Sequence, residues 1–409
     1  MSALTKSLID GADRLVRVVS PQRPRLDAAA FLRGAERKWG AVNPLYREAL
    51  EVLLESAERE ADLSLFGRHA LRWDLQRMLR NCRLIERHAA TTPAAAAPRE
   101  APIFILGLPR TGSTFLHRLL AEDPHNLVPR CWQTLEPAPR PAGFDPQQDP
   151  RARRAERMLA GFGRLAPDLA ALHPLGADLP QECTEITAHT FCSLAFDTIL
   201  RVPGYLDWLD RRGHDEAYAF HRRFLRFLDD GGARRWVLKC PDHVFALDAL
   251  LKIYPDARLV VTHRDPLAVI PSVARLTEVL RQPFSRRVDA RAVGAEVAGR
   301  WADGARRLTA LAERQDLPRR RIFHLHYALF VSNPVAAVAT MYQYFGLPLE
   351  AATRERFRRF IDTLPRGGYG RNQYSFDSFG LDRRALERTF AGYCERFGLG
   401  LRTPAAGIA

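Results

Sequence analysis

The sequence predicts an α/β fold in which a parallel β-sheet of the P-loop type is flanked by helices, with an N-terminal helical cap and a helical insertion. Short apolar runs alternate with helical patterns after residue 100, which indicates βαβ crossovers and a parallel sheet. The first of these runs ends in a glycine-containing loop that leads into a helix. Residues 1–90 instead carry apolar residues at three- and four-residue spacing and contain no convincing strand.

The predicted cap spans residues 1–95, and composition sets its end. Three amphipathic helices are expected in it, at 28–39, 45–58 and 63–87. Residues 91–98 read Thr-Thr-Pro-Ala-Ala-Ala-Ala-Pro, which is typical of a linker. Residues 96–409 are predicted to form the sheet domain, with the helical insertion at about 150–235.

The elements of the sheet domain follow from apolar runs, helical spacing and turn residues. Strands are expected at 102–106, 128–132, 236–239, 258–263 and 321–327. Helices are expected at 113–122, 266–280, 290–314, 334–345, 350–361 and 382–397. Asp123-Pro124 ends the first of these helices, and Asp265 followed by Pro266 is a typical helix start.

Composition limits the functions that the chain can have. The net charge is +14, which favours anionic ligands, but only four of the 61 basic residues are lysines and the arginines are spread along the whole chain. Nucleic acid is therefore not expected as a partner. The six cysteines show no C-x-x-C pair and no zinc-type spacing, so no metal site and a reducing, cytoplasmic location are expected. No apolar stretch reaches the roughly 18 residues of a membrane span. The amphipathic pattern of residues 1–19 leaves peripheral contact with a membrane open.

Residues 103–116 contain the candidate binding motif on which the functional interpretation depends. Its apolar run breaks at Gly107, passes through Pro-Arg-Thr-Gly and resumes with Ser113 and Thr114 at a helix start. Backbone N–H groups at such a helix N-terminus hold phosphate. Gly107 and Gly112 have the spacing of a P-loop, but the Walker lysine is missing. The loop is therefore predicted to hold a nucleotide other than a simple triphosphate.

Three basic residues come at the carboxyl ends of predicted strands: Arg110, Lys239 and Arg264. The ends of parallel strands meet at one edge of a sheet, and ligands of α/β sheets bind at that edge. These cations are therefore expected to lie on one rim, an arrangement that suits a nucleotide with phosphates at two separate places.

Two motifs at this rim resemble those of sulfotransferases. Residues 109–116, Pro-Arg-Thr-Gly-Ser-Thr-Phe-Leu, are similar to the 5′-phosphosulfate loop of that family. Residues 261–266, Val-Thr-His-Arg-Asp-Pro, with Ser272 eight residues after Arg264, are similar to its 3′-phosphate motif. The resemblance covers about residues 100–400, and the bacterial branch related to tyrosylprotein sulfotransferases is the most similar.

A third motif, Arg366-Gly367-Gly368 with Tyr374-Ser375, resembles the glycine-rich C-terminal element of the family. The resemblance implies that the chain is an enzyme that transfers a sulfuryl group from 3′-phosphoadenosine 5′-phosphosulfate (PAPS) to a hydroxyl, leaving the product PAP, without a metal. The nucleotide-binding residues that it implies are Arg110, Thr111, Gly112, Ser113, Thr114, Phe115, Arg264 and Ser272.

Catalysis is expected to come from positioning and charge stabilisation. A sulfuryl group carries less charge than a phosphoryl group, so side-chain cations can replace magnesium. Arg110 is expected to stabilise charge on the bridging oxygen, although it cannot donate a proton at ordinary pH. Lys239, one of the few lysines, is expected to supply a compact and adjustable charge.

Four residues are candidates for the general base. His243 would titrate near neutrality. Glu136 lies near the place where relatives with a carboxylate base carry their glutamate, although the position right after the tryptophan is Gln133 here. Glu182 and Glu185 are further carboxylates near a predicted apolar helix, and the sequence leaves the choice among the four open.

The acceptor is expected to be a small molecule or a lipid, and phenolic, carbohydrate and protein-tyrosine hydroxyls also remain candidates. Its pocket is predicted between the cap and the insertion, where Phe191, Phe196, Tyr205 and Trp208 offer either an apolar lining or core packing. Two other functions stay open: a nucleotide-binding scaffold with impaired catalysis, and a P-loop kinase or NTPase. The latter needs a lysine after Gly112 and a Walker-B-like aspartate, and the sequence shows neither. The sequence does not indicate the oligomeric state or a pathway.

Overall fold

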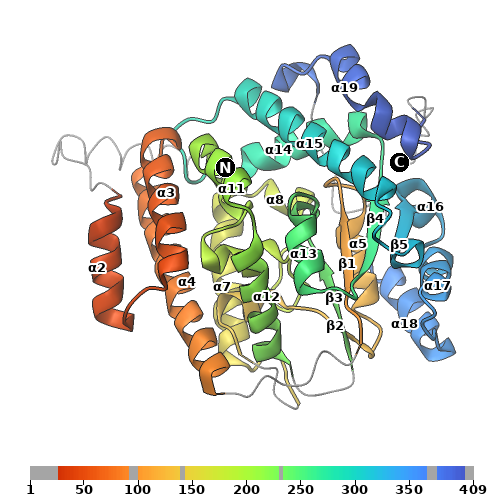
Figure 1. The fold of residues 1–409 in the computed structure, drawn as a ribbon, viewed down its shortest axis with the longest axis horizontal. Coiled ribbons are helices and arrows are strands. Elements are labelled where there is room, and N and C mark those ends of the chain that lie inside the picture. The colour runs from red at the N-terminus through yellow and green to blue at the C-terminus, as the bar shows by residue number, and fades with distance from the viewer. Residues whose placement is uncertain (1–25, 92–99, 139–142, 230–233, 366–374, 401–409) are drawn as a thin grey trace.

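A parallel β-sheet forms the centre of the structure (Figure 1). The structure, a computed structural model, describes residues 26–91, 100–138, 143–229, 234–365 and 375–400. The strands are β1 (Ile103–Gly107), β2 (Asn126–Leu127), β3 (Arg235–Lys239), β4 (Arg258–His263) and β5 (Ile322–His326). They pair in the order β2-β3-β1-β4-β5, and every pair is parallel. The predicted α/β fold is confirmed.

Helices cover both faces of the sheet. The side chains of β1 alternate between the two apolar clusters that lie on these faces. One face is covered by α5 (Ser113–Leu120), α17 (Pro334–Tyr344) and α18 (Ala351–Asp362), and Ile103 and Ile105 pack among these helices. Phe104 and Leu106 point to the opposite face and join the larger core. A strand buried on both faces is continuously apolar, which is why β1 shows no polar alternation.

The larger core lies between the sheet and the remaining helices of the domain. These are the 3-10 helix η2 (Pro241–Ala246), α13 (Leu247–Ile253), α14 (Pro266–Arg281), α15 (Ala290–Glu313) and α19 (Arg383–Arg396), while α16 (Tyr327–Ser332) follows β5. Asp265 caps α14 as predicted, since its carboxylate accepts the Leu267 N–H at 2.9 Å and Pro266 follows at the first helical position.

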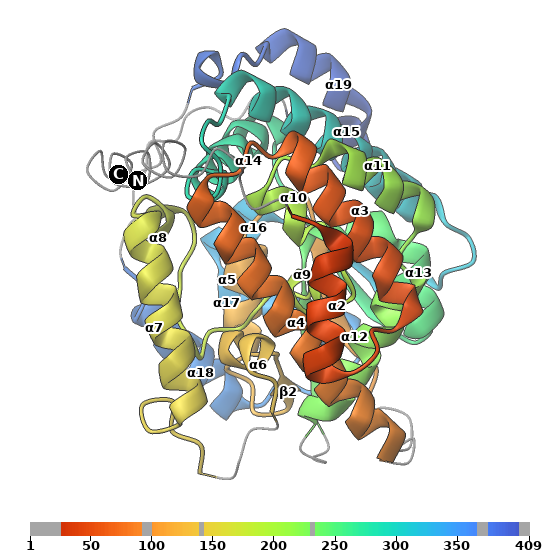
Figure 2. The ribbon, with the colours of Figure 1, turned by 90° about the vertical axis from the view of Figure 1, so that its left-hand side faces the viewer.

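In the described part of the cap, residues 26–91, three helices stand beside the insertion (Figure 2). They are α2 (Ala28–Trp39), α3 (Pro44–Glu60) and α4 (Leu65–Thr91), close to the predicted ranges. Asp27 caps α2 and Asn43 caps α3 through their side-chain oxygens. Buried residues of all three helices belong to the same apolar cluster as Phe104 and Leu106 of β1. The cap is therefore packed into the core of the sheet domain, and the predicted boundary near residue 95 lies outside the described residues.

The insertion is helical, as predicted. Its elements are α7 (Pro150–Leu165), α8 (Leu169–Leu172), α9 (Thr184–Thr187), η1 (Ala188–Thr190), α10 (Ala195–Ile199), α11 (Pro203–Arg212) and α12 (Asp215–Leu228). Phe191, Phe196 and Tyr205 are fully buried in the main core, and Trp208 packs against its edge. The aromatic run therefore provides core packing.

The strand expected at 128–132 is wrong. The second strand consists of Asn126–Leu127 only, and Cys131–Leu135 form the short helix α6. The side-chain oxygen of Gln133 accepts the N–H of Arg130 at 3.0 Å, a bond that satisfies a free donor at the start of this helix. Capping therefore prevails over the apolar pattern at this place.

A buried ion pair joins β3 to the loop before β2, and its loss is expected to destabilise the fold. Arg235 and Asp123 are each 2% exposed and lie 3.0 Å apart, and the Tyr342 hydroxyl also donates to Asp123 at 2.7 Å. Replacing Arg235 with methionine leaves a buried carboxylate without its cation, which costs about 3–5 kcal/mol of unfolding free energy. Urea denaturation of both proteins measures this difference.

The matched control is Arg59→Met, which removes the exposed ion pair between Arg59 and Glu55. Solvent screens such pairs, so this variant is expected to unfold at nearly the same urea concentration as the original protein. Equal stability of the Arg235 and Arg59 variants would contradict the assigned role of the buried pair.

Candidate active site

The predicted phosphate loop connects β1 to α5, and two glycines give it its shape. Gly107 has a φ of 141°, and a Cβ at this position would lie 2.3 Å from the carbonyl oxygen of Thr262. Gly112, the N-cap of α5, has a φ of 82°, and a Cβ there would approach the Tyr327 ring to 3.1 Å. Only glycine fits these positions without strain, so β4 and α16 can approach the loop backbone closely.

Arg110 has an unusual backbone conformation, and both its side chain and its carbonyl group form hydrogen bonds. Its φ of 62° is left-handed, which is rare for a residue with a Cβ. Its Nε donates to the Ser272 hydroxyl at 3.2 Å, and a terminal nitrogen donates to the Leu172 carbonyl at 2.6 Å. Arg264 donates to the Arg110 carbonyl at 2.8 Å. The structure thus brings together the loop arginine and the two residues of the predicted 3′-phosphate motif.

The remaining loop residues are fixed by the sheet and by aromatic neighbours. Thr111 is buried, and its hydroxyl lies 2.6 Å from that of Thr262 on β4. The centre of the Phe115 ring lies 4.9 Å from the centre of the Phe330 ring on α16. The Arg264 guanidinium lies 4.1 Å from the centre of the Tyr327 ring, which the sequence did not single out.

Lys239 is the buried cation of the site, with 2% of its surface exposed. Its Nζ donates to the Thr114 hydroxyl at 3.1 Å and forms an ion pair with the Glu182 carboxylate. The N–H of Cys183 donates to the Lys239 carbonyl at 3.0 Å, and this backbone bond holds Glu182 beside β3. Burial raises the pKa of Glu182, but attraction to Lys239 and His173 outweighs it and holds that pKa below its ordinary value. Glu182 is thus an ionised and partly exposed carboxylate beside the loop.

Two further carboxyl groups lie near Glu182. Burial, and next Asp74, raise the pKa of Glu185 to about 7. Burial, and next Glu182, raise the pKa of Asp242 to about 6, although Asp242 accepts a hydrogen bond from the Thr184 hydroxyl at 3.1 Å. Of the three carboxyl groups, Glu182 has the lysine as its partner and remains a carboxylate at lower pH than the others.

His173 is a neighbour of the site that sequence reasoning missed. It follows α8 and is partly exposed. Burial, and next the charge of Lys239, lower its pKa to about 4, and Glu182 and Arg110 also act on it. Its ring is therefore neutral at ordinary pH. Proline follows His173 in the sequence, which is typical of the end of a helix and gives no sign of a functional role.

The other two candidates for the base lie in different surroundings. His243 is buried, its Nδ1 is hydrogen-bonded to the Tyr218 hydroxyl, and its ring meets that of Phe104 edge-on at 5.1 Å. Burial lowers the pKa of His243 well below its ordinary value. Glu136 is paired with Arg154, which lowers the pKa of that carboxyl. These contacts favour structural roles for both residues.

Within the described residues, no group of three His, Cys, Asp or Glu side chains has a metal-binding arrangement. The glycine-rich motif at 366–368 and Tyr374 lie outside those residues. The groups that the structure gathers around the loop are backbone amides at the start of α5, hydroxyls, and the cations Arg110, Lys239 and Arg264. Such hydrogen-bond donors and cations suit a negatively charged ligand.

A comparison with known protein families shows which family the chain belongs to. The model of the sulfotransferase family matches residues 102–351, well over half of the chain. The chain belongs to the sulfotransferase family. It is therefore a transferase that moves a sulfuryl group to an acceptor.

Two solved structures and one curated protein that are similar to this sulfotransferase come from mycobacteria. The crystal structure of sulfotransferase STF1 from Mycobacterium tuberculosis has a TM-score of 0.78 and 30% identity, and covers 90% of this chain and 100% of its own. That of STF9 from Mycobacterium avium has a TM-score of 0.80 and 27% identity, with 93% and 99% covered. The omega-hydroxy-beta-dihydromenaquinone-9 sulfotransferase Stf3 of Mycobacterium bovis is 26% identical over 322 residues, 75% of this chain and 77% of its own. No described helix of the present sulfotransferase is long and apolar enough to span a bilayer.

Proposed function

We propose that this sulfotransferase takes its sulfuryl group from PAPS and delivers it to the hydroxyl of a small-molecule or lipid acceptor. The observation that carries the proposal is the position of the cations at the loop. Lys239 lies with Thr114 on one side, and Arg264 and Ser272 meet Arg110 on the other. Two separate groups of donors match a nucleotide that has a 5′-phosphosulfate and a 3′-phosphate.

The residues fit this donor in charge and hydrogen bonding. The start of α5 offers backbone N–H groups and the partial positive charge of a helix N-terminus to the phosphosulfate, and the Ser113 and Thr114 hydroxyls add further donors. Arg264 and Ser272 would hold the 3′-phosphate, exchanging their present bonds to Arg110 for bonds to the anion. The aromatic rings of Phe115 and Tyr327 lie beside these donors and can flank a nucleoside base.

The proposed chemistry assigns one task to each side chain of the Lys239–Glu182 pair. Glu182 accepts the proton of the acceptor hydroxyl as the acceptor oxygen forms its bond to sulfur. The bond between sulfur and the bridging oxygen of the 5′-phosphate breaks, and Lys239 and Arg110 stabilise the negative charge that this oxygen gains. PAP, with the bridging oxygen on its 5′-phosphate, is then released as the leaving group.

The acceptor class is supported by the relative from Mycobacterium bovis, whose name states that it sulfates a hydroxylated menaquinone. A hydroxyl on a largely apolar molecule is the corresponding proposal for this chain. A kinase or NTPase is not favoured, because Ser113 occupies the place of the Walker lysine.

The donor proposal predicts that Arg264→Ala selectively weakens the binding of nucleotides with a 3′-phosphate. Loss of a charged hydrogen bond of about 2 kcal/mol corresponds to roughly 30-fold weaker binding of PAP. AMP, which lacks the 3′-phosphate, is expected to bind with an almost unchanged dissociation constant. Isothermal titration calorimetry with PAP and AMP measures both values.

The matched control is Arg59→Ala, an exposed arginine on α3, which should leave both dissociation constants unchanged. Transfer of labelled sulfate from PAPS to hydroxyl acceptors completes the test. Binding of ATP with magnesium dependence, together with no binding of PAP, would overturn the proposed donor.

A further inference from the structure

Tyr327 contacts both parts of the candidate donor site, and the register of the sheet puts it there. It is the first residue of α16 and directly follows His326, the last residue of β5. His326 pairs with His263 of β4, so the next residues of the two chain segments, Tyr327 and Arg264, leave the same edge of the sheet as neighbours. Strand pairing therefore places this ring beside the arginine of the predicted 3′-phosphate motif.

The contact between Tyr327 and Arg264 is close. The guanidinium carbon lies 4.1 Å from the centre of the ring, well inside the roughly 6 Å within which a cation is attracted to an aromatic face. A second contact holds the same guanidinium, because Arg264 Nη1 donates to the Arg110 carbonyl at 2.8 Å. The ring and the carbonyl together limit the directions in which this long side chain can point.

The Tyr327 ring is itself supported by the loop and by the core. A Cβ added at Gly112 would lie 3.1 Å from the Tyr327 Cδ2, so the ring packs on the backbone at the start of α5. Three residues further along α16, Phe330 is fully buried in the core on the α5 side of the sheet. Because both neighbours are fixed, the ring offers Arg264 a rigid surface.

A fixed guanidinium matters for the binding of an anion. An arginine side chain has several rotatable bonds, and ordering them opposes binding. A side chain that already has its bound orientation loses less freedom when the ligand arrives, and the ligand binds more tightly. Since Arg264 is assigned to the 3′-phosphate, this gain applies to nucleotides that carry that group.

We infer that Tyr327 is a positioning residue, which holds the Arg264 guanidinium for the 3′-phosphate and so helps to distinguish nucleotides with this group from those without it. The inference rests on the proposed function, because it takes Arg264 as a ligand of the 3′-phosphate. A ring that only supported the loop, or only stacked on the nucleoside base, would strengthen the binding of PAP and AMP to the same extent. The ratio of the Kd of AMP to the Kd of PAP therefore isolates the positioning role.

Isothermal titration calorimetry with PAP and AMP tests the inference. Tyr327→Leu is expected to lower the ratio about five- to tenfold, less than removal of the arginine itself, through weaker binding of PAP. Tyr327→Phe keeps the aromatic face and should keep the ratio within about twofold of the original. In a protein that already carries Arg264→Ala, Tyr327→Leu should lower the ratio no further, because the two residues act as one unit.

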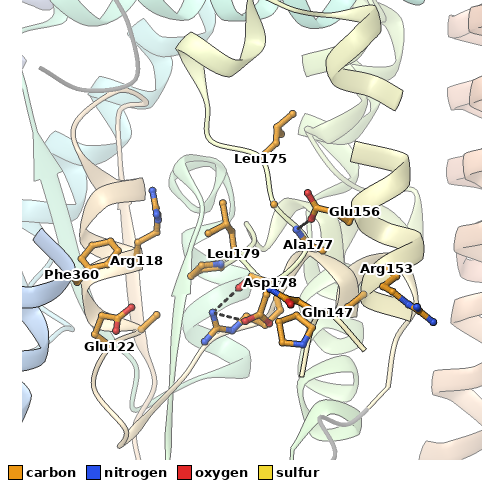
Figure 3. A pocket seen from close by; sticks show the side chains of 16 residues that line it. Arg118, Glu122, Gln147, Arg153, Glu156, Leu175, Ala177, Asp178, Leu179 and Phe360 are labelled. Atoms are coloured by element: carbon orange, nitrogen blue, oxygen red, sulfur yellow. Dashed lines mark hydrogen bonds and ion pairs between the residues drawn. The ribbon is translucent and has the colours of Figure 1, made fainter. Parts of the chain in front are cut away.

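The matched control is Phe360→Leu, which removes another ring that lies beside an arginine. The Arg118 guanidinium lies 5.3 Å from the centre of the Phe360 ring, and both side chains line a cavity of about 570 Å³ beside α5 (Figure 3). Among the described residues that line this cavity, none is assigned to the donor. The control should therefore leave the ratio unchanged.

Three results would overturn the inference: an unchanged ratio in Tyr327→Leu, an equal fall in Tyr327→Phe, or a further fall when Tyr327→Leu is added to Arg264→Ala. Binding of AMP by each variant shows that it is folded. Equal Kd values for PAP and AMP in the original protein would instead overturn the assignment of Arg264 to a 3′-phosphate, so the two failures are distinguishable.

Discussion

Replacement of Lys239 by methionine is expected to lower kcat about 100- to 1000-fold. Methionine fills the same volume without a charge, so the oxygen that gains negative charge during transfer loses a buried cation close to the loop. Glu182 loses its ion-pair partner at the same time, and the pKa of its carboxyl rises. Both changes act on the chemical step. Steady-state transfer of labelled sulfate from PAPS, at saturating donor, measures the effect.

Two control variants test whether the effect depends on the position of Lys239 and on the shape of its charged group. Lys252→Met removes an exposed lysine that pairs with Asp215, and it should leave kcat unchanged. Lys239→Arg keeps the charge but replaces a compact ammonium with a planar group, so it is expected to recover only part of the activity. A folded Lys239→Met protein that retains more than a tenth of the original turnover would contradict the assigned role.

The sequence was sufficient for the conformation of the loop between β1 and α5, because local signals determine that part of the fold. Gly107 and Gly112 mark positions that only glycine fits, and Asp265-Pro266 starts α14 where capping predicts it. Arg264 and Ser272 then come to the same edge as Arg110, because parallel strands place their carboxyl ends together.

The partner of Lys239 could not be selected from sequence. Glu182 lies 57 residues away, in the helical insertion, and reaches the lysine through a backbone hydrogen bond between Cys183 and β3. Nothing in local spacing distinguishes Glu182 from Glu185, one turn further along. The sequence favoured His243 as a base that titrates near neutral pH. It could not show that the His243 ring is buried against Phe104, because this contact depends on tertiary packing.

Replacement of Glu182 by glutamine is expected to lower kcat by roughly 1000-fold, within the range for loss of a general base. Glutamine keeps the size of the side chain and a hydrogen bond to Lys239, but it cannot accept the acceptor proton. PAP should still bind, since the nucleotide contacts assigned to Arg264 and Ser272 are untouched. Labelled-sulfate transfer and calorimetry with PAP measure the two quantities separately.

The pH profile of the original protein distinguishes Glu182 from its neighbour. The base is active when ionised, so activity falls as the pH decreases through the pKa of that carboxyl. The ion pair with Lys239 holds the pKa of Glu182 below its ordinary value of 4.5, so kcat/KM should show no acidic loss down to about pH 5. A base at Glu185, with a pKa of about 7, would instead halve kcat/KM near neutrality. The control Glu185→Gln should therefore retain most of the turnover. A limb near pH 7 that disappears in Glu185→Gln would assign the base to Glu185 and leave Glu182 as the partner that holds Lys239 in place.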